Sequence, residues 1–262
     1  MKLLCLNIWG GKVYKPLFKF LKKQSKDVDI FCFQEVLRSP VSRFSNGAKT
    51  DISNDLLKIL KGYNCYLATP FLSGYDLKEK VDFDLTISQA TFVRKGIKVI
   101  SEQSIFVYGK EGPVSMWNIK RLKKRYLDVP RNMQCLTIKV GNKKILIGNL
   151  HGFWMPISKK DTDHRIAQSY KIREVFDSFK GPRILCGDFN LHPETKSMRI
   201  LEENMKNLII EYGLTSTRSS LHKRKQKFAD YIMASDEVKI NKFEAINESV
   251  SDHLPLLLDF SV

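Results

Sequence analysis

Short apolar runs recur along the whole chain and are separated by polar breaks. Their length and their content of Val, Ile, Leu and Phe predict β-strands rather than helices. The predicted strands lie at residues 2–8, 29–34, 63–68, 85–93, 97–107, 134–140, 144–150, 183–187, 228–234, 242–246 and 256–260.

Between some of these runs, apolar residues recur at the three- and four-residue spacing of an amphipathic helix. The helical sets are Val13, Leu17, Phe18 and Leu21; Leu56, Leu57 and Leu60; Ile172, Val175, Phe176 and Phe179; and Met198, Leu201 and Met205. These helices are too few for a purely alternating β–α–β fold. The order of elements therefore predicts an α+β protein with two packed sheets and helices outside.

Several long connections lie beside the predicted strands, at residues 37–50, 71–83, 109–132, 152–163 and 215–227. Long loops in a compact protein more often have a function than none. We therefore expect parts of the functional site in these segments.

Six apolar segments meet polar residues at one end. A buried carboxylate is costly unless it is paired or binds a metal, so the repetition predicts that these ends converge on one site. The residues concerned are Asn7, Glu35, His151, Asp188, Asn190, Asp230, Asp252 and His253.

Such a cluster offers the hard oxygen ligands that suit Mg²⁺ or Mn²⁺. Its two imidazoles could contact a phosphate or transfer protons. The spacing of the five cysteines does not match a zinc site. We interpret them as small buried apolar side chains in a reducing compartment; they are Cys5, Cys32, Cys65, Cys135 and Cys186.

The chain resembles the endonuclease/exonuclease/phosphatase superfamily, which has the deoxyribonuclease-I-like fold. The resemblance rests on an ordered set of motifs: Asn7, Gln34-Glu35, Asn149-Leu150-His151-Gly152, Gly187-Asp188-Phe189-Asn190, Asp230-Tyr231-Ile232 and Ser251-Asp252-His253. The segment 163–168 is similar to a helix start that members place between the His and Asp strands. The resemblance implies a four-layer sandwich of two mixed β-sheets flanked by helices, in a single domain over residues 1–262.

The resemblance also implies a metal site and an attacking water. Glu35 would be the principal ligand of Mg²⁺ or Mn²⁺, and Asn7 and Asp252 would complete or support the site. Asp188 would orient or deprotonate the water. Asn190 would hold that water or a phosphate oxygen.

Two histidines complete the implied site. His253 would bind the scissile phosphate, and Asp230 would hold His253 in its tautomer. His151 would contact the phosphate or assist the leaving oxygen. Positioning and charge stabilisation dominate phosphoryl transfer, so the expected activity is metal-dependent hydrolysis of a phosphodiester.

The formal net charge of +16 favours a polyanionic partner. Nucleic acid is the first candidate, and an anionic membrane surface is the second. Basic runs at residues 120–125 and 222–227 could track phosphates, although a solvated loop is the alternative for each. From the first run we expect phosphate contacts by Arg121, Lys123, Lys124 and Arg125.

The chief hypothesis is a nuclease. The second is a lipid or small-phosphoester hydrolase, because Asn7-Ile8-Trp9-Gly10 is similar to the opening of some sphingomyelinase-like members. The third, an inactive nucleic-acid-binding module, is disfavoured because every expected polar position is filled. Polar and glycine residues interrupt the first apolar run too early for a signal peptide, and no run is long enough to span a bilayer. We therefore expect a cytoplasmic protein without an obligate protein partner.

Overall fold

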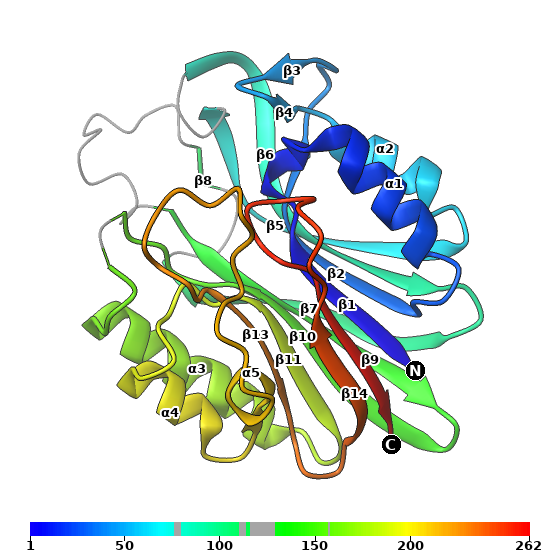
Figure 1. Cartoon of the computed structure of the whole chain (residues 1–262), viewed down its shortest axis with the longest axis vertical. Coiled ribbons are helices and arrows are strands. Elements are labelled where there is room, and N and C mark those ends of the chain that lie inside the picture. The colour runs from blue at the N-terminus through cyan, green and yellow to red at the C-terminus, as the bar shows by residue number, and fades with distance from the viewer. Residues whose placement is uncertain (76–79, 110–113, 116–128, 157) are drawn as a thin grey trace.

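A computed structural model describes residues 1–75, 80–109, 114–115, 129–156 and 158–262. Two large mixed β-sheets lie face to face, and helices cover their outer faces (Figure 1). This is the predicted four-layer arrangement. None of the helices in the described ranges is long and apolar enough to cross a bilayer.

The first sheet has seven strands. In spatial order they are β14 (Lys239–Ala245), β15 (Leu256–Ser261), β1 (Lys2–Asn7), β2 (Ile30–Arg38), β6 (Lys80–Arg94), β5 (Tyr63–Tyr75) and β8 (Val114–Ser115). The first and last long strands of the chain, β1 and β15, pair antiparallel, whereas β1 and β2 pair parallel.

The second sheet has six strands. In spatial order they are β12 (Lys206–Asn207), β13 (Asp230–Ala234), β11 (Arg183–Asp188), β10 (Lys143–His151), β9 (Arg131–Val140) and β7 (Lys98–Tyr108). Here β10 and β11 are the parallel pair. A separate hairpin is formed by β3 (Phe44–Ser45) and β4 (Ala48–Lys49).

The helices are η1 (Trp9–Gly11), α1 (Tyr14–Gln24), α2 (Ile52–Ile59), α3 (Asp163–Ser178), α4 (Lys196–Glu202) and α5 (Leu208–Glu211). Helices α1 and α2 lie on the outer side of the seven-stranded sheet, and α3 and α4 lie on the outer side of the other sheet (Figure 1). All four predicted helical segments are therefore confirmed. The short elements β12 and α5 were not predicted, because two to four residues are too few to show a period.

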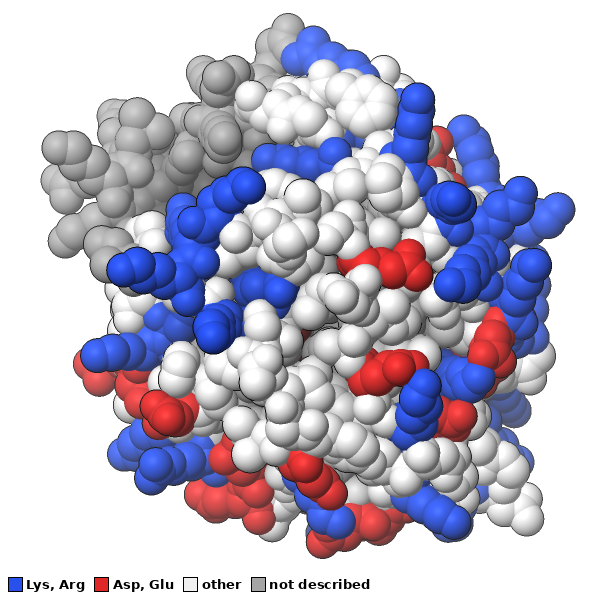
Figure 2. Space-filling model, in the orientation of Figure 1, with Lys and Arg blue, Asp and Glu red and all other residues white. Residues whose placement is uncertain are grey.

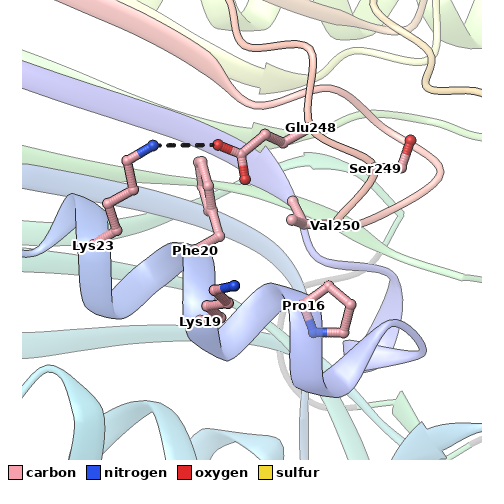
Figure 3. Close-up of a pocket in the computed structure, with 7 residues that line it drawn as sticks. All are labelled: Pro16, Lys19, Phe20, Lys23, Glu248, Ser249 and Val250. Carbon is pink, nitrogen blue, oxygen red and sulfur yellow. Dashed lines mark ion pairs between the residues drawn. The ribbon is translucent and has the colours of Figure 1, made fainter.

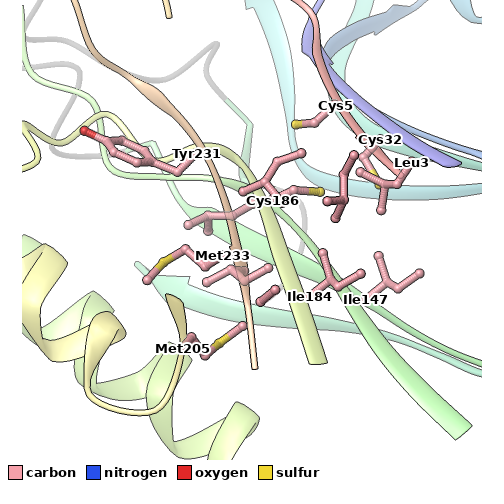
Figure 4. Packing of buried hydrophobic residues seen from close by; sticks show 14 of the residues in the cluster. Leu3, Cys5, Cys32, Ile147, Ile184, Cys186, Met205, Tyr231 and Met233 are labelled. Atoms are coloured by element: carbon pink, nitrogen blue, oxygen red, sulfur yellow. The ribbon is translucent and has the colours of Figure 1, made fainter. Parts of the chain in front are cut away.

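Alternate residues of β1 enter two different cores, as expected for a strand buried on both faces. Leu3 and Cys5 belong to the core between the sheets, and Leu4 and Leu6 belong to the core beneath α1 and α2. In the first of these cores, Leu3, Cys5 and Cys32 of one sheet meet Ile147, Ile184 and Cys186 of the other (Figure 4). These three cysteines are buried and free, as predicted.

The segment 71–83 was expected to be a loop, but β5 extends to Tyr75 and β6 begins at Lys80. The start of β6 alternates charged and apolar residues, with Phe83 and Leu85 buried and Asp84 exposed. The exposed Asp84 interrupts the apolar run, although buried and exposed positions continue to alternate along the strand. The predicted strands 63–68 and 85–93 are therefore present, and the correction concerns how far each extends into the segment between them.

A buried polar chain links the two sheets close to their functional edge. Gln34 Nε2 donates to Asn149 Oδ1 at 2.6 Å, and Asn149 Nδ2 donates to Thr91 Oγ1 at 3.2 Å. Thr91 Oγ1 in turn donates to Gln134 Oε1 at 2.7 Å. All four side chains are at most 1% exposed. Because buried amides are costly without partners, this chain fixes how the sheets face each other.

Candidate active site

The polar residues that end the apolar strands lie together at one edge of the sandwich. The parallel pairs β1–β2 and β10–β11 bring their carboxyl ends to this edge. In register, His151 lies opposite Asp188, and Asp188 lies opposite Asp230 on β13. The predicted convergence is therefore present. It rests on the pairing of strands that are far apart in sequence.

Glu35 reaches the site because β2 is irregular there. Its φ is +57°, and the pairing of β2 with β6 shifts register between Phe33 and Val36. A bulge of this kind re-aims a side chain that strict alternation would direct elsewhere. A positive φ is rare at non-glycine residues in general, and the residues that have one are often found at functional sites. Burial raises the pKa of Glu35, the Asn7 hydrogen bond and His253 lower it, and Asp252 and Asp188 raise it; the net shift is upward.

Asn7 lies between two carboxylates. Its Nδ2 donates to Glu35 Oε1 and to Asp188 Oδ2, both at 3.1 Å, and its Oδ1 accepts from the Trp9 backbone N–H at 2.9 Å. The amide thus holds the two carboxylates near each other. Oriented in this way, it directs N–H groups rather than its oxygen to the site, and its role as a metal ligand stays a prediction.

Asp188 is surrounded by cationic and ring nitrogens. His253 Nε2 lies 3.8 Å from its Oδ2, and His151 Nε2 lies 4.0 Å away. Burial raises the pKa of Asp188, but Lys159, the two histidines and Arg218 lower it more. The net effect lowers the pKa of Asp188 well below its usual range, so this carboxyl stays ionised even in acid.

The residues flanking Asp188 explain its motif. Gly187 has a φ of +142°, and a Cβ there would lie 1.9 Å from the Leu150 carbonyl oxygen. Only glycine fits this position. After the strand, the Asn190 backbone N–H donates to Asp188 Oδ1 at 3.0 Å, and Asn190 Nδ2 donates to the Gly152 carbonyl at 3.2 Å.

Asp230 and His253 form a buried pair. The imidazole Nδ1 lies 2.7 and 2.8 Å from the two carboxylate oxygens of Asp230. This contact leaves Nε2 directed towards Asp188 and Asp252, at 3.8 and 3.6 Å. Burial opposes the charge on His253, but the attraction of Asp230 outweighs it, so the pKa of His253 is raised.

Asp252 lies on the other side of His253 and contacts Arg218, which the sequence analysis did not single out, and His222, which begins the basic run 222–227. Its Oδ2 lies 3.2 Å from Arg218 Nη1 and 3.4 Å from His222 Nδ1. Arg218 Nη1 also contacts His253 Nε2. The other carboxylate oxygen, Oδ1, is buried and accepts no hydrogen bond from the residues the structure describes.

His151 is a buried, neutral imidazole. Burial, together with the nearby Arg131 guanidinium, lowers its pKa to about 3. Its Nε2 lies 3.9 Å from Glu35 Oε1. At neutral pH this ring can therefore donate a hydrogen bond or bind a metal without adding charge.

Two further cations adjoin the carboxylates. Arg131, at the start of β9, lies near Asp188 and Glu35, and burial lowers its pKa. Lys159 Nζ donates to Asn190 Oδ1. Burial lowers the pKa of Lys159 to about 8, although Asp188 counteracts this shift.

The loop that holds Lys159 is fastened from within by the start of α3. Arg165 is fully buried and donates to the backbone carbonyls of Lys160 and Ser158, at 2.5 and 2.8 Å. Gln168 Oε1 accepts from the Phe153 backbone N–H at 2.8 Å. The predicted helix start is confirmed, because Thr162 caps α3 by accepting from the Arg165 N–H.

Arg131, Lys159 and Arg218 were missed by the sequence analysis, and His222 was named only as the start of the basic run 222–227. Each lies in or beside a segment expected to be functional. However, a single cation among 44 Lys and Arg residues has no distinguishing pattern. The predicted contacts Arg121, Lys123, Lys124 and Arg125 lie outside the described residues and stay predictions.

The donor set fits a hard divalent cation. Oxygens of Glu35 and Asp188 and a nitrogen of His151 lie within 4.8 Å of one another, as do ligand atoms of Asp188, Asp230 and His253. Neither group includes Asp252. However, its buried Oδ1 without a hydrogen-bond partner is the kind of oxygen that a cation would satisfy.

The model of the Endonuclease/Exonuclease/phosphatase family matches residues 4–253. The chain belongs to this family. Its members hydrolyse phosphoester bonds and generally use a divalent metal. The family match spans the first and last motifs of the site, Asn7 and His253. No functionally curated protein matches the chain by sequence.

Solved structures of family proteins share the fold. One, from Leptotrichia buccalis C-1013-b, is 17% identical with a TM-score of 0.71, and each chain is fully covered. The mannosyl-6-phosphatase Bt3783 of Bacteroides thetaiotaomicron VPI-5482 is 16% identical with a TM-score of 0.69, again with full coverage. The human Nocturnin catalytic domain with bound sulfate is 17% identical with a TM-score of 0.67, covering 100% of this chain and 93% of that one. These likenesses establish the fold.

Proposed function

We propose that this family member is a nuclease that hydrolyses nucleic-acid phosphodiesters by water attack, with Mg²⁺ or Mn²⁺ as cofactor. The observation that carries the proposal is the convergence of Glu35, Asp188 and Asp252 with the Asp230–His253 pair. Carboxylates and a held imidazole at one strand edge are the parts that phosphoryl transfer requires.

Glu35 would hold the metal, with Asn7 and Asp252 completing the site and Asp188 and His151 adjacent to it. When bound, the metal would supply Lewis-acid stabilisation of the charge that develops on the phosphoryl oxygens. The raised pKa of Glu35 reflects burial above all, and a bound cation would offset it.

Asp188 and Asn190 suit the attacking water. Because its pKa is strongly lowered, Asp188 is ionised at neutral pH and can accept a hydrogen bond from water. Asn190 is fixed by its bonds to Asp188 and Gly152, so its amide has a defined position beside that water. Both residues orient the nucleophile rather than form a covalent intermediate.

His253 suits the phosphate. Its raised pKa favours the imidazolium, and its Nε2 faces the site while Nδ1 is held by Asp230. A cationic donor at this position would bind a phosphoryl oxygen and stabilise negative charge in the transition state. Arg218, Lys159 and Arg131 add fixed positive charge around the same point.

Two features support nucleic acid as the substrate. The net charge of +16 raises the local concentration of polyanions. In addition, Lys223, Arg224, Lys225 and Lys227 precede Asp230 and lie in or beside the segment that holds Arg218. Exposed cations next to the site suit a substrate that continues beyond the scissile phosphate.

A smaller phosphoester is the second candidate function. Arg131, Lys159 and Arg218 converge on Asp188 and its neighbours, and so compact a group of cations also suits a terminal, doubly charged phosphate. Sugar phosphates and sphingomyelin-like lipids belong to this alternative. One of the solved structures that share the fold is named a mannosyl-6-phosphatase.

A substrate panel tests the proposal. The wild-type protein and Glu35→Gln are assayed on labelled DNA, labelled RNA, sphingomyelin, sugar phosphates and inositol phosphates, each with Mg²⁺, Mn²⁺ or EDTA. We expect metal-dependent cleavage of DNA or RNA that the variant lacks. Turnover of only a lipid or a sugar phosphate would move the chain to the second candidate. Full activity in EDTA would contradict the metal requirement.

A further inference from the structure

Helix α1 has a one-sided charge pattern that the candidate site does not explain. Residues 12–26 contain six lysines and no Asp or Glu. Leu17, Phe20 and Leu21 of this helix are buried in the core beneath it. The lysines therefore occupy the side that faces solvent.

Four of the lysines form a stripe. Lys15, Lys19, Lys22 and Lys26 follow one another at intervals of four, three and four residues, which places them within about 60° of one another around a helix axis. All four are exposed. The part of the stripe within the helix is about 10 Å long at 1.5 Å per residue, and Lys26 extends it into the following turn.

The charges of this stripe are not neutralised by the protein. Among the residues that the structure describes, none of the four has an ion-pair partner, whereas the neighbouring Lys23 lies 3.6 Å from Glu248. Like charges at these helical spacings repel one another. A face that keeps four such charges attracts anions and would be stabilised by binding one.

A groove beside the stripe is bordered by the loop that leads to the candidate active site. Pro16, Lys19, Phe20 and Lys23 of α1, together with residues 248–250, line a groove of about 430 Å³. Figure 3 shows Phe20 and Lys23 directed from α1 towards that loop. The loop runs directly into Asp252 and His253, and Ser251 Oγ donates to the Asn7 carbonyl at 2.7 Å. One wall of the groove is thus joined to the site.

An exposed aromatic ring lies at the N-terminal end of the stripe. Phe44 of the β3–β4 hairpin is 57% exposed and packs edge-on against Tyr14 of α1, with ring centroids 5.4 Å apart. Lys49 Nζ lies 5.5 Å from the Phe44 centroid. A cationic track with an exposed ring at its end suits nucleotides, since bases stack on such rings.

We propose that the Lys15–Lys19–Lys22–Lys26 face of α1 is a second docking surface for the phosphate backbone of a nucleic-acid strand that also enters the active site. This proposal rests on the proposed nuclease function. A bilayer is the less suitable partner, because a membrane-binding helix inserts its apolar face, and that face of α1 is already buried in the core. The groove also favours a linear polyanion over a flat surface.

Figure 2 shows basic and acidic side chains gathered in different parts of one face of the molecule. Lys and Arg side chains crowd the region over α1 and α2, and Asp and Glu side chains gather along the lower edge of the same face. A strand that follows the stripe would thus run over the basic part of this face and away from its acidic edge.

The test compares two variants with the same net charge. In the first, Lys15, Lys19, Lys22 and Lys26 are replaced by Gln. In the matched control, the exposed residues Lys98, Lys139, Lys143 and Lys144 of β7, β9 and β10 are replaced by Gln. Both variants reduce the formal net charge from +16 to +12. All eight positions are exposed, and circular dichroism checks that both variants fold.

Binding of a long labelled oligonucleotide is measured in EDTA by fluorescence anisotropy over a range of salt concentrations. For the α1 variant we expect at least tenfold weaker binding at low salt, and a log–log salt slope reduced by about 3, since each released phosphate contact contributes about 0.7 for a single strand. The control variant should show only a small change. Equal losses in both variants would overturn the proposal, because net charge alone would then explain binding.

Two further measurements separate this proposal from the proposed function. Hydrolysis of bis(p-nitrophenyl) phosphate with Mn²⁺ should be unchanged in the α1 variant, since the stripe lies outside the site. If the wild type binds oligonucleotides through the stripe but cleaves none, the docking surface stands and the nuclease function fails. If it cleaves them equally well in both variants and binds them without dependence on the stripe, the docking surface fails alone. Stripe-dependent binding to phosphatidylserine vesicles, without stripe-dependent oligonucleotide binding, would also overturn the proposal.

Discussion

Glu35 and Asp188 hydrogen-bond to the same Asn7 amide, yet their protonation equilibria are shifted in opposite directions. The pKa of Glu35 is raised, chiefly by burial. The pKa of Asp188 is lowered, because Lys159 and two imidazoles outweigh the effect of its burial. Carboxylates whose environments separate their pKa values take different chemical roles. The opposite shifts agree with the proposed roles, in which Glu35 holds the metal and Asp188 orients the water.

Glu35→Gln and Asp188→Asn should each lower kcat on the order of a hundredfold or more, as expected when charge positioning is lost in an isosteric variant. Steady-state kinetics on the substrate identified by the panel measures the effect. Asp236→Asn is the control, because that carboxylate is 85% exposed and pairs only with Lys206 among the described residues. Near-normal turnover in either site variant would remove the role assigned to that residue.

Asp230 and His253 should act as a unit. His253→Ala removes the phosphate contact, and after that change Asp230 has no imidazole to orient. The double variant with Asp230→Asn should therefore be little slower than His253→Ala alone. A double-mutant cycle on kcat/KM measures this coupling. Additive losses in activation free energy, with both single variants folded, would leave Asp230 as a structural residue.

The pH dependence of His253 follows from the same contact. Because its pKa is raised, the imidazolium persists above the usual range and is lost as pH rises through the shifted value. Asp230→Asn should lower this pKa and move the alkaline limb of the kcat profile to lower pH. The shift can be read directly by NMR titration of the His253 ring protons in the metal-free protein. An unchanged pKa in Asp230→Asn would contradict the assigned cause.

At the scale of elements, the loop between β10 and α3 supplies Lys159 without regular structure of its own. Its geometry comes from Arg165, whose guanidinium donates to three backbone carbonyls, those of Phe153, Ser158 and Lys160. Burial lowers the pKa of Arg165 to about 10. Phe153 is fully buried and packs against Tyr108 at 4.4 Å between ring centroids. Phe153 thus anchors the loop to the core.

Arg165→Met should therefore lower the free energy of unfolding by about 3 kcal/mol, since it leaves buried carbonyls without donors. It should also raise KM by displacing Lys159. The control is Arg173→Met on the same helix, where the pairs with Asp177 and Glu203 are at the surface and the loss should stay below about 1 kcal/mol. Urea unfolding measures both variants. Equal stabilities would show that the loop is held mainly by other contacts.

At the scale of the whole molecule, one edge of the sandwich concentrates charges of the same sign. Glu35, Asp188 and Asp252 come from β2, β11 and the segment before β15, and each is less than a fifth exposed on its side chain. Arg218, Lys159 and Arg131 match these three charges in number, but the buried Oδ1 of Asp252 accepts no hydrogen bond from the described residues. A divalent cation would therefore be expected to stabilise the fold as well as to serve the reaction.

Mg²⁺ or Mn²⁺ should raise the unfolding temperature of the metal-free protein, with a stabilisation of about 2.7 kcal/mol at a hundredfold excess over Kd. Glu35→Gln should lose most of this increase, and Asp236→Asn should keep it. Differential scanning calorimetry after EDTA dialysis measures the effect without any substrate. The same unfolding temperature with and without metal in the wild type would contradict a metal site here.

The sequence by itself determined most of the strands, the helices and which polar residues at the ends of apolar strands come together. Apolar positions that repeat every two residues in strands or about every 3.6 residues in helices are local signals. They can therefore be recognised without knowing the tertiary contacts. Asp188 and His253 stand out because carboxylates and imidazoles are rare at the ends of apolar strands. Gly187 before Asp188 could also be recognised as part of the motif. The sequence did not show why a glycine is needed there, which is the closeness of the Leu150 carbonyl.

The tertiary structure alone decided which cations complete the site and how the carboxylates are held. Asn7 reaches Asp188 across 181 residues of sequence. The pairing of β1 with β2 and of β10 with β11 aligns the strand ends within each sheet, and the packing of the two sheets against each other brings those ends together. Arg131, Lys159 and Arg218 resemble every other basic residue in a chain of net charge +16. Their distinction is burial beside carboxylates, which is a property of three-dimensional packing and leaves no periodic trace in the sequence.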